Sequence, residues 1–506
     1  MNLLKILKVN VDKFPTKPFL IYQNNKYTYE EAYKIIKQVS SLFDNLGLKK
    51  GDTVAAMCFN TPAFVFSMFA AWDLGLIFVP INHKLKSKAL EFVLKDSNTK
   101  LLLFDNQLAE TVQAVNHTCI KLTTQGNTQP FDCFETLYQK HNFSLYSYDL
   151  QDNDIAQILY TSGTTGMPKG CVMKHSSITF AALIAALGLS FVPTDILLMA
   201  MPIWHSSPLN NWFGATLVVG GTTVLQREYH PQELLENIQK EKVTAYFGAP
   251  ISLIMPTKLP NFAEYNLTSI RAWIYGGGPI SPTTAKELMT LYKNTNFYQV
   301  FGMTETGPLG MTLYPYEQLT KAGSLGKNSM PGVEMKLINE LGNVATKGEI
   351  AEIYFRTDSL MSEYLNKEEE TKEVFTLDGF YKTGDLVRID DDGYIFVVDR
   401  RKEMIITGGE NVFSKEIEDC ILECTAVSEV AVIGLPHEEW GETVTAFIIL
   451  KQGQTLSADE LKAYITSKLA KYKVPKKYFF VEDFPRTPTG KTQKFLLKQQ
   501  YENINN

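Results

Sequence analysis

The sequence has no excess of positive charge, and this limits the partners it can bind. Its 506 residues include 49 Lys and Arg against 55 Asp and Glu, which gives a formal net charge of −6 at pH 7. Proteins that bind nucleic acids or anionic membranes depend mostly on clustered Lys and Arg. The charge balance therefore argues against such a protein, and we expect no nucleic-acid partner.

Cysteine is also scarce. The six cysteines form no Cys-x-x-Cys pair, a usage typical of reduced thiols, and we predict a cytoplasmic protein. Cys420 and Cys424 are four residues apart on a predicted helix and could supply half of a metal site, but only His437 follows nearby as a further ligand. The pattern favours core or surface thiols over a metal site.

Long apolar runs are lacking as well. A membrane-spanning helix needs roughly 20 apolar residues. Residues 60–72 and 176–194 are uncharged, but the first stretch is interrupted by Pro62 and Ser67, and the second carries several hydroxyl residues. We predict that both are buried helices and that no transmembrane segment is present. Residues 1–15 lack the apolar core and cleavage site of a secretory signal, so we expect the protein to stay where it is made.

What the sequence does contain is enough apolar material for large cores, with 45% hydrophobic and 21% charged residues. Helical periodicity alternates with short apolar runs rich in β-branched residues, which is typical of parallel βαβ units. This predicts an α/β fold with a large N-terminal domain of layered mixed sheets and helices. The expected helices are 29–46 and 62–74, and the expected strands are 53–57, 77–80, 101–104, 243–247 and 272–275.

The pattern changes near residue 380. From residue 378 to 412, Asp-Gly and Gly-Gly turns separate short β runs within a cluster of charges, which indicates a domain edge and a hinge. We therefore predict two domains, 1–399 and 400–506, the second a small, mobile α+β domain. Its expected helices are 415–424 and 458–469, and its expected strands are 430–434 and 444–450.

Gly, Ser and Thr are concentrated in residues 159–170, LYTSGTTGMPKG, which we interpret as a strand end, a loop, a lysine and then a helix. Glycines let backbone N–H groups turn toward an anion, hydroxyls add donors, and Lys169 supplies a positive charge. The string therefore predicts a phosphate cradle. It is not a Walker A loop, because Pro168 stands where that motif requires glycine, five residues after Gly163.

This string resembles the signature loop of the AMP-forming adenylating superfamily, which includes acyl-CoA synthetases, peptide-synthetase adenylation domains and firefly luciferase. Further superfamily motifs follow in the expected order, and the resemblance covers nearly the whole chain. The matching segments are Tyr298-Gln299-Val300-Phe301-Gly302-Met303-Thr304-Glu305-Thr306-Gly307, Gly379-Phe380-Tyr381-Lys382-Thr383-Gly384-Asp385-Leu386, Asp399-Arg400-Arg401-Lys402-Glu403-Met404-Ile405 and Pro485-Arg486-Thr487-Pro488-Thr489-Gly490-Lys491.

The resemblance implies a site for ATP and Mg²⁺. Thr304 would contact phosphate, Glu305 would hold Mg²⁺, and Asp385 and Arg400 would reach the ribose. Phe301 stands where many members have Tyr, so stacking on adenine is retained but the hydroxyl is absent. The other residues expected to bind nucleotide are Thr161, Ser162, Gly163, Thr164, Thr165, Gly166, Lys169, Gly276, Gly277, Gly278, Gln299 and Gly302.

The resemblance also implies the catalytic groups. Lys491 would meet the negative charge that grows on the bridging oxygens, and His205 would lie beside the substrate carboxylate and gate access to it. Lys402 would be the hinge about which the small domain rotates after adenylation. Gly408 and Gly409 would then line a tunnel for the thiol of coenzyme A, although a plain hairpin turn remains an alternative for this pair.

The function that this resemblance implies is an acid:CoA ligase, which joins a carboxylic acid to AMP from ATP and then to coenzyme A. A free-standing enzyme that loads an acyl carrier protein would share every motif, but no carrier-like segment follows Lys491. A luciferase-like oxygenase is a rarer alternative, and a non-catalytic binding protein would require decayed catalytic residues. Homodimers occur in the superfamily, and the sequence does not decide the oligomeric state.

The substrate is expected to be apolar. The windows expected to line the acyl pocket hold mostly apolar or small residues, and no Arg or Lys that could pair with a second carboxylate. This favours a fatty or other apolar monocarboxylic acid, with an aryl acid as the alternative. The windows are 205–213, 275–279, 300–303 and 308–311, and the aromatic residues in or beside them are Trp204, Trp212, Tyr275 and Phe301.

Overall fold

The computed structural model describes residues 1–143, 147–161, 168–278, 280–486 and 492–502. The chain divides into two compact units, the first of Met1–Met335 and Phe355–Tyr381, the second of Lys336–Tyr354 and Lys382–Asn506. Arg400, where the sequence predicts a domain boundary, lies inside the second unit. The mixed α/β architecture expected from the sequence is confirmed in the first unit, and an α+β arrangement in the second.

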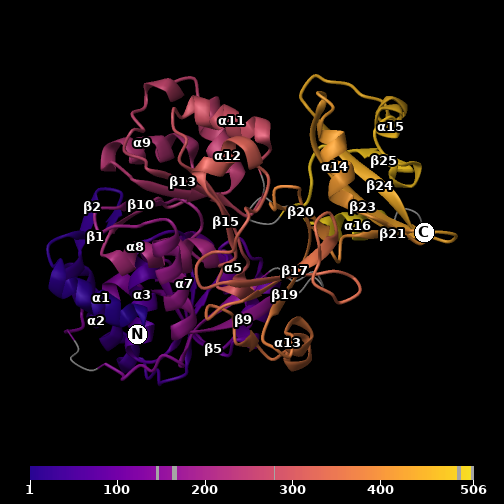
Figure 1. Ribbon diagram of the computed structural model, residues 1–506. Helices are drawn as coiled ribbons and strands as arrows, with labels where there is room; N and C mark the ends of the chain where they lie inside the picture. The colour runs from indigo at the N-terminus through magenta and orange to yellow at the C-terminus, as the bar shows by residue number, and fades with distance from the viewer. Residues whose placement is uncertain (144–146, 162–167, 279, 487–491, 503–506) are drawn as a thin grey trace. The chain divides into compact units, whose positions relative to one another are not determined.

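The first unit contains an eight-stranded sheet of order β15-β14-β13-β12-β10-β11-β1-β2 (Figure 1). The six inner strands pair in parallel, and the two edge strands pair antiparallel. The carboxyl ends of β12, β13 and β14 therefore meet at one edge, where functional residues of parallel sheets gather. The strands are β1 (Pro18–Tyr22), β2 (Asn25–Thr28), β10 (Ile196–Met199), β11 (Thr222–Leu225), β12 (Ala245–Gly248), β13 (Ala272–Gly276), β14 (Phe297–Phe301) and β15 (Met311–Leu313).

A second eight-stranded sheet in the same unit has the order β18-β9-β8-β4-β3-β5-β6-β7. Strands β8 and β9 form an antiparallel hairpin in which Thr161 pairs with Lys169. The predicted helix after Lys169 is therefore wrong: Lys169 begins a strand, and the next helix begins at His175. The strands are β3 (Thr53–Met57), β4 (Ile77–Pro80), β5 (Thr99–Asp105), β6 (Ile120–Thr124), β7 (Asp132–Cys133), β8 (Ile155–Thr161), β9 (Lys169–Lys174) and β18 (Glu363–Tyr364).

Helices cover these sheets. They are α1 (Leu3–Lys13), α2 (Tyr29–Asn45), α3 (Pro62–Asp73), α4 (Ser87–Asp96), α5 (Ala109–Gln113), α6 (Phe134–Tyr138), α7 (His175–Gly188), α8 (Gly214–Val219), α9 (Pro231–Glu241), α10 (Pro250–Ile254), α11 (Pro282–Leu291), α12 (Pro315–Lys321) and α13 (Glu368–Val374). Short 3₁₀ helices are η1 (Asn106–Leu108), η3 (Met255–Lys258), η4 (Phe262–Glu264) and η5 (Thr304–Thr306), and η2 (Ser207–Phe213) is a π-helix. Helix α2 begins with a capping box, in which Thr28 and Glu31 satisfy each other's backbone N–H groups.

The two uncharged stretches differ in burial. Every residue of α3 is buried, as predicted. Helix α7 also buries most of its residues, as predicted, although Leu183 and Leu187 are exposed. Among the residues that the structure describes, no helix combines the length and apolarity that a membrane crossing needs.

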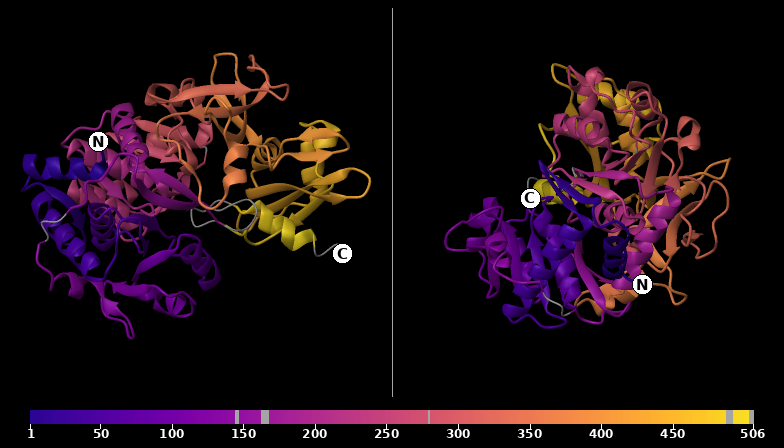
Figure 2. Two further views of the ribbon diagram at one scale, coloured as in Figure 1. Left: turned by 90° about the horizontal axis from the view of Figure 1, so that it is seen from below. Right: turned by 90° about the vertical axis from the view of Figure 1, so that its left-hand side faces the viewer.

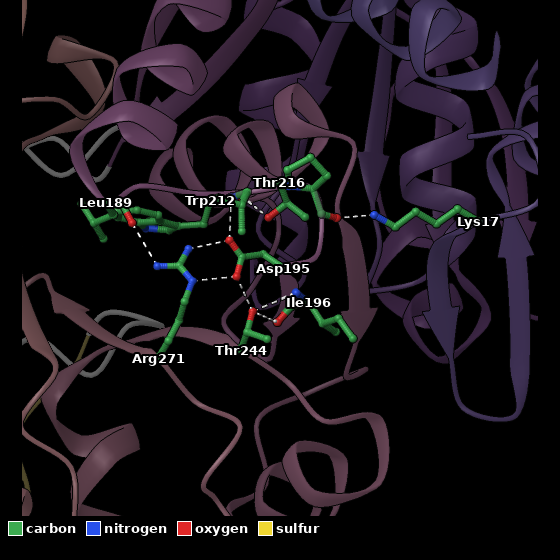
Figure 3. A network of polar contacts seen from close by, with 10 residues as sticks. Lys17, Leu189, Asp195, Ile196, Trp212, Thr216, Thr244 and Arg271 are labelled. Carbon is green, nitrogen blue, oxygen red and sulfur yellow. Dashed lines mark hydrogen bonds and ion pairs between the residues drawn. The ribbon is translucent and has the colours of Figure 1, made fainter. Parts of the chain in front are cut away.

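A buried ion pair ties three strands of the first sheet together (Figure 3). Asp195, just before β10, accepts hydrogen bonds from Arg271 Nε and Nη2 at 2.7 and 2.5 Å, and from Thr244 Oγ1 at 2.7 Å. Thr244 precedes β12 and Arg271 precedes β13. Burial opposes the charge, but hydrogen bonds from Arg271, the Val192 N–H and Thr244 hold the pKa of Asp195 below its usual value. The ionised carboxylate thereby fixes the amino ends of the strands whose opposite ends carry the candidate site.

The second unit contains most of a four-stranded sheet, β16-β17-β19-β20, and a five-stranded sheet in which β22-β21-β24-β23 is extended by β25 beside β24. Helix α16 packs against β23 (Figures 1 and 2). The strands are β16 (Glu334–Ile338), β17 (Ile350–Arg356), β19 (Tyr381–Ile389), β20 (Ile395–Arg400), β21 (Ile405–Thr407), β22 (Glu410–Val412), β23 (Val427–His437), β24 (Gly441–Leu450) and β25 (Lys477–Phe480). The helices are α14 (Ser414–Leu422), α15 (Ala458–Thr466), α16 (Lys494–Glu502) and the 3₁₀ helix η6 (Lys471–Lys473).

Candidate active site

The predicted phosphate loop connects β8 and β9. Thr161 and Lys169 face each other at its two ends, and Thr161 Oγ1 donates a hydrogen bond to the Lys169 carbonyl at 3.4 Å. Five predicted loop residues lie outside the described residues: Ser162, Gly163, Thr164, Thr165 and Gly166. Lys169 itself stands on the strand β9, so no helix begins directly after it.

Lys169 and Glu305 both contact one tyrosine. The Lys169 ammonium lies 5.1 Å from the centre of the Tyr364 ring, and the Tyr364 hydroxyl donates a 2.9 Å hydrogen bond to Glu305 Oε1. Lys169 also forms an ion pair with Glu370. Lys169 and Glu305, which are far apart in the sequence, thus contact the same side chain: the Lys169 ammonium lies over the Tyr364 ring, and the Glu305 carboxylate accepts from the Tyr364 hydroxyl.

Glu305 is held at both its backbone and its side chain. It lies in η5, and its carbonyl accepts a 2.9 Å hydrogen bond from the Met361 N–H. Burial, together with the Glu305 charge, raises the pKa of Tyr364 far above its usual value. Tyr364 is therefore a neutral donor toward Glu305, and the Tyr381 hydroxyl lies 3.2 Å from the Tyr364 hydroxyl. Sequence reasoning missed Tyr364, because a lone tyrosine followed by a charged stretch carries no distinctive signal.

The donor chemistry here suits Mg²⁺. In the described part of the chain, no three His, Cys, Asp or Glu side chains cluster as a dedicated metal cage. Mg²⁺ in nucleotide enzymes is commonly bound by one or two carboxylates together with substrate phosphates, rather than by a cage made of protein alone. A single oriented carboxylate at Glu305, close to Lys169, fits that pattern.

The predicted base-binding residues lie at the carboxyl ends of β13 and β14. A side chain at Gly276 would meet the Val300 carbonyl at 2.9 Å, so this glycine is required by packing between the two strands. Gly277 has φ +81°, and a Cβ added at Gly278 would meet only Pro250, at 3.8 Å. Gly278 therefore leaves more open space for a ligand than Gly276 does.

Gln299 and Phe301 differ in their surroundings. Gln299 is buried, and its Oε1 lies 3.1 Å from the Tyr275 hydroxyl. Phe301 is half-buried, with its ring centre 6.1 Å from that of Phe355. Gly302 follows, and a Cβ there would lie 2.3 Å from the Pro308 carbonyl, so only glycine fits. Gln299 thus supports the strand internally, whereas Phe301 keeps part of its side chain accessible.

His205 lies at the end of a loop that is fixed by Asn60. The buried Asn60 side chain donates to the carbonyls of Met199, Met201 and Gln226 at 3.0 to 3.2 Å, and its Oδ1 accepts from the Ile203 N–H at 2.8 Å. Sequence reasoning missed Asn60, because no motif surrounds it. Its hydrogen bonds set the backbone path that leads to His205.

The segment after His205 is the π-helix η2, a form found mostly at functional sites. Residues Pro208–Phe213 are all buried, including Asn210 and Asn211. Asn210 Oδ1 accepts from Gln157 Nε2 at 2.7 Å, and Asn211 Nδ2 donates to the Pro308 carbonyl at 3.1 Å. Trp212 lies face to face with Phe247, with ring centres 5.4 Å apart. This window of the expected acyl pocket is therefore apolar but contains two buried amides, while Pro279 of another window lies outside the described residues.

In the second unit, Asp385 and Arg400 face each other across β19 and β20. Arg400 Nε lies 3.1 Å from Asp385 Oδ1, and the Asp385 N–H donates to Thr383 Oγ1 at 3.0 Å. The two residues expected to contact ribose are therefore adjacent. Lys402 follows in a turn in which the Arg400 carbonyl accepts from the N–H groups of Glu403 and Met404 at 2.8 and 3.0 Å.

Gly408 and Gly409 form the two-residue turn between β21 and β22, with φ +59° and +84°. Two positive φ angles are the signature of the hairpin turns that favour glycine. The Gly408 N–H donates to the Trp440 carbonyl at 2.9 Å, and a Cβ added at either glycine would meet nothing within 4 Å. Gly408 and Gly409 therefore form a hairpin turn, the alternative considered from the sequence, and the space beside both glycines is open.

Lys491 lies outside the described residues, but the chain on both sides of it is anchored. Arg486 Nη2 lies 2.9 and 2.8 Å from the two carboxylate oxygens of Glu429. In the described residues that follow, the half-buried Lys494 contacts Glu418 Oε1 at 2.7 Å, Ser414 Oγ at 2.7 Å and Glu403 at 3.2 Å. The segment with the predicted catalytic lysine is thus held at both ends within the second unit.

Two protein-family models match this chain. The family model "AMP-binding enzyme" matches residues 7–365, and "AMP-binding enzyme C-terminal domain" matches residues 416–491. The chain is 33% identical to the long-chain-fatty-acid–CoA ligase FadD13 of Mycobacterium tuberculosis over 478 residues, which is 94% of this chain and 93% of the relative. It is 31% identical to feruloyl-CoA synthase of Amycolatopsis sp. over 474 residues, 94% of each.

A solved structure gives the same picture at the level of the fold. The ATP-bound crystal structure of MatB from Rhodopseudomonas palustris is similar over all of both chains, with a TM-score of 0.89 and 28% sequence identity.

Proposed function

The chain belongs to the AMP-binding enzyme family, and from this premise we propose that it is an AMP-forming acid:CoA ligase. It would convert a carboxylic acid, ATP and coenzyme A into an acyl-CoA thioester, AMP and pyrophosphate. The observation that carries the proposal is the meeting of Lys169 and Glu305 on Tyr364. This arrangement provides a cation for phosphate oxygens and a carboxylate for a metal ion at one place.

The first half-reaction transfers the adenylyl group. A carboxylate oxygen of the acid attacks the α-phosphorus of ATP, the bond from that phosphorus to the bridging oxygen breaks, and pyrophosphate leaves. Two anions must meet while negative charge grows on the bridging oxygen, so positioning and electrostatic stabilisation supply the catalysis. We assign Thr161, Lys169 and Thr304 to the phosphates and Lys491 to the developing charge.

Mg²⁺, held by Glu305, would neutralise phosphate charge when bound. The contribution of the chain itself is orientation. Tyr364 donates to Glu305 Oε1 and the Met361 N–H fixes its backbone, so the carboxylate keeps one direction. Partners of this kind orient ligands and tune metal sites.

The second half-reaction forms the thioester. The sulfur of coenzyme A attacks the acyl carbon, the bond from that carbon to the AMP oxygen breaks, and the thiol proton is lost. We propose that rotation of the predicted small domain, residues 400–506, about Lys402 withdraws Lys491 between the two steps. Gly408 and Gly409 would then line the path of the thiol, a role that the open space beside both glycines supports.

We propose an apolar monocarboxylic acid as substrate, most simply a fatty acid. The buried, uncharged window of η2, with Trp212 against Phe247, supports this choice. FadD13 is named for long-chain fatty acids, which agrees with it. The name of feruloyl-CoA synthase, together with the aromatic side chains of the window, keeps an aryl acid as the second candidate.

The test is pyrophosphate release by the purified protein with ATP and Mg²⁺, across short, medium and long fatty acids and several aryl acids, each with and without coenzyme A. We expect release that depends on one acid class and increases when coenzyme A is present. Release with an acid but without a thioester product would contradict coenzyme A as acceptor and favour an acyl carrier protein. No release with any acid would contradict the proposed function.

A further inference from the structure

A buried histidine outside all the predicted motifs contacts the segment that carries His205. His83 lies three residues after the end of β4, and its side chain is buried. The indole Nε1 of Trp204 donates a hydrogen bond to His83 Nδ1 at 3.1 Å. The Trp204 ring in turn lies against the His205 ring, with centres 3.8 Å apart and planes inclined by 34°. A chain of contacts therefore runs from His83 through Trp204 to His205.

The hydrogen bond fixes the protonation of His83. An indole N–H can only donate, so His83 Nδ1 must be unprotonated, and the ring proton lies on Nε2. Burial, aided by the charges of Lys84 and Arg227 and opposed by Asp105, lowers the pKa of His83 to about 4. His83 is thus a neutral acceptor at neutral pH. Its Nε2 faces Glu228 Oε1 at 3.9 Å.

The His83 ring is also fixed by packing. It lies against the Phe59 ring with centres 4.3 Å apart, and the Arg227 guanidinium lies 4.3 Å from the centre of Phe59. Arg227 itself is anchored to both oxygens of the buried Asp105 carboxylate at 2.9 and 2.8 Å. A side chain held in this way presents its acceptor nitrogen in one direction, which is what positioning of a neighbouring group requires.

The hydrogen bonds of Asn60 fix the backbone before Trp204 but do not determine the plane of the Trp204 ring. Asn60 fixes the chain from Met199 to Ile203, but it makes no contact with the Trp204 or His205 rings among the hydrogen bonds described. The plane of the Trp204 ring is set instead by its indole hydrogen bond. The Trp204 ring is the surface against which the His205 ring lies.

We propose that His83 is a positioning residue for adenylation: by accepting the Trp204 indole proton, it fixes the ring against which His205 lies, and so sets the orientation of His205 toward the substrate carboxylate. The inference rests on the proposed function, in which His205 lies beside that carboxylate.

Three single variants separate the hydrogen bond from packing. H83L removes the acceptor, H83N keeps an acceptor oxygen close to the position of Nδ1, and W204F removes the donor but keeps an aromatic ring. With the acid identified in the panel, we expect H83L to raise KM for the acid about tenfold, the scale of one lost buried hydrogen bond, with KM for ATP unchanged. H83N should stay close to the unsubstituted protein. The double variant H83L/W204F should have a KM for the acid no higher than that of the more impaired of the two single variants, H83L and W204F.

Equal increases in KM for acid and for ATP, failure of H83N to restore activity, or additive losses in the double variant would each overturn the positioning role. Non-additive effects are the expected sign that two residues act as one unit.

A second readout needs no substrate. The indole N–H signal of Trp204 in a ¹H–¹⁵N NMR spectrum can be assigned from its absence in W204F. We expect it to move in H83L and to stay near its original position in H83N. An unmoved signal in H83L overturns the proposal, whatever the activity. If the unsubstituted protein releases no pyrophosphate with any acid, the proposed function fails, and the NMR result still decides whether His83 fixes Trp204.

Discussion

At the scale of single residues, the candidate site depends on side chains that orient other side chains. Tyr364 orients Glu305, Asn60 fixes the loop before His205, and Trp204 supports the His205 ring. Tyr364 and Asn60 were not predicted from the sequence, and Trp204 was expected only as an aromatic residue beside the acyl pocket. Glycine-rich strings around Glu305 and Lys169 carry a recognisable pattern, whereas a supporting residue is defined only by the distance it spans in the folded chain. Tyr364 lies 59 positions from Glu305.

The first prediction concerns Tyr364. Removing its hydroxyl in Y364F deprives Glu305 of its 2.9 Å hydrogen bond without emptying the space of the ring. Loss of such an outer partner typically costs about 10- to 100-fold in metal affinity or activity. We expect the Mg²⁺ concentration for half-maximal pyrophosphate release to rise by about this factor.

The control for this variant is Y316F, because Tyr316 is exposed. Titration of Mg²⁺ at saturating ATP and acid measures the Mg²⁺ concentration for half-maximal pyrophosphate release in both variants. An unchanged Mg²⁺ requirement in Y364F would show that Tyr364 does not orient a metal ligand.

At the scale of elements, most of the helices and strands that the hydrophobic pattern predicted are present in the structure, and the predictions failed where a local feature overrode the pattern. Val243 was expected to begin a strand, but its N–H bonds to the Ile238 carbonyl after Lys242 adopts φ +52°. It therefore completes the end of α9, and β12 begins at Ala245. The strand at Lys169 was missed because a polar hairpin edge resembles a helix start when only one sequence is read.

The second prediction concerns the ion pair before β10. The pKa of Asp195 is lowered, so its contribution to stability is present above the pKa of an unfolded aspartate, about 4, and is lost as the pH falls through the lower folded pKa. D195N leaves Arg271 without its carboxylate. We expect it to reduce the free energy of unfolding by about 3 kcal/mol at pH 7, with the difference shrinking below about pH 4.

Urea unfolding followed by tryptophan fluorescence at several pH values measures this difference. The control is D44N, since Asp44 takes part only in an exposed ion pair with Lys49 at 3.8 Å. A D195N effect that stays constant from pH 7 to pH 3 would contradict the assignment to the ionised carboxylate.

The third prediction concerns the anchor of the tail after the Lys491 segment. Lys494 is half-buried near Glu418, Glu403 and Asp399, and the first two lie 2.7 and 3.2 Å from its ammonium. K494M leaves these carboxylates without their cation, which typically costs about 3–5 kcal/mol. We expect the second unit to unfold at lower urea concentration and adenylation to slow.

The matched control is K498M, one turn further along α16, where Lys498 pairs with Glu442 at 2.8 Å in a more exposed position. Limited proteolysis with mapping of the cleavage sites reports on the second unit directly. Equal protection of K494M and K498M would show that Lys494 is not the anchor.

At the scale of the whole molecule, the proposed ligase activity consists of two reactions that use different residues. The sequence predicted this division because motifs for both reactions follow in order along the chain. The sequence could not predict the acyl chain length of the substrate or the acceptor of the acyl group. The depth of the acyl pocket depends on backbone geometry, such as the π-helix turn of η2 that places Asn210 and Asn211 inside the fold.

The fourth prediction separates the two reactions. K491A should slow formation of acyl-AMP by orders of magnitude while leaving thioester formation from supplied acyl-AMP largely intact, because electrostatic stabilisation of the first transition state is lost. K402P should restrict the hinge and slow mainly the thioester step. Equal loss of both steps in K491A, or normal turnover in K402P, would contradict the assigned roles.

The most direct test of the central claim is a single-turnover experiment with the purified protein, Mg²⁺, ATP and the preferred acid, followed by mass spectrometry before and after coenzyme A is added. We expect enzyme-bound acyl-AMP before coenzyme A is added, and conversion of this acyl-AMP to acyl-CoA and AMP afterwards. Acyl-CoA formed with ADP as the other product, or no acyl-AMP with any acid, would contradict the central claim.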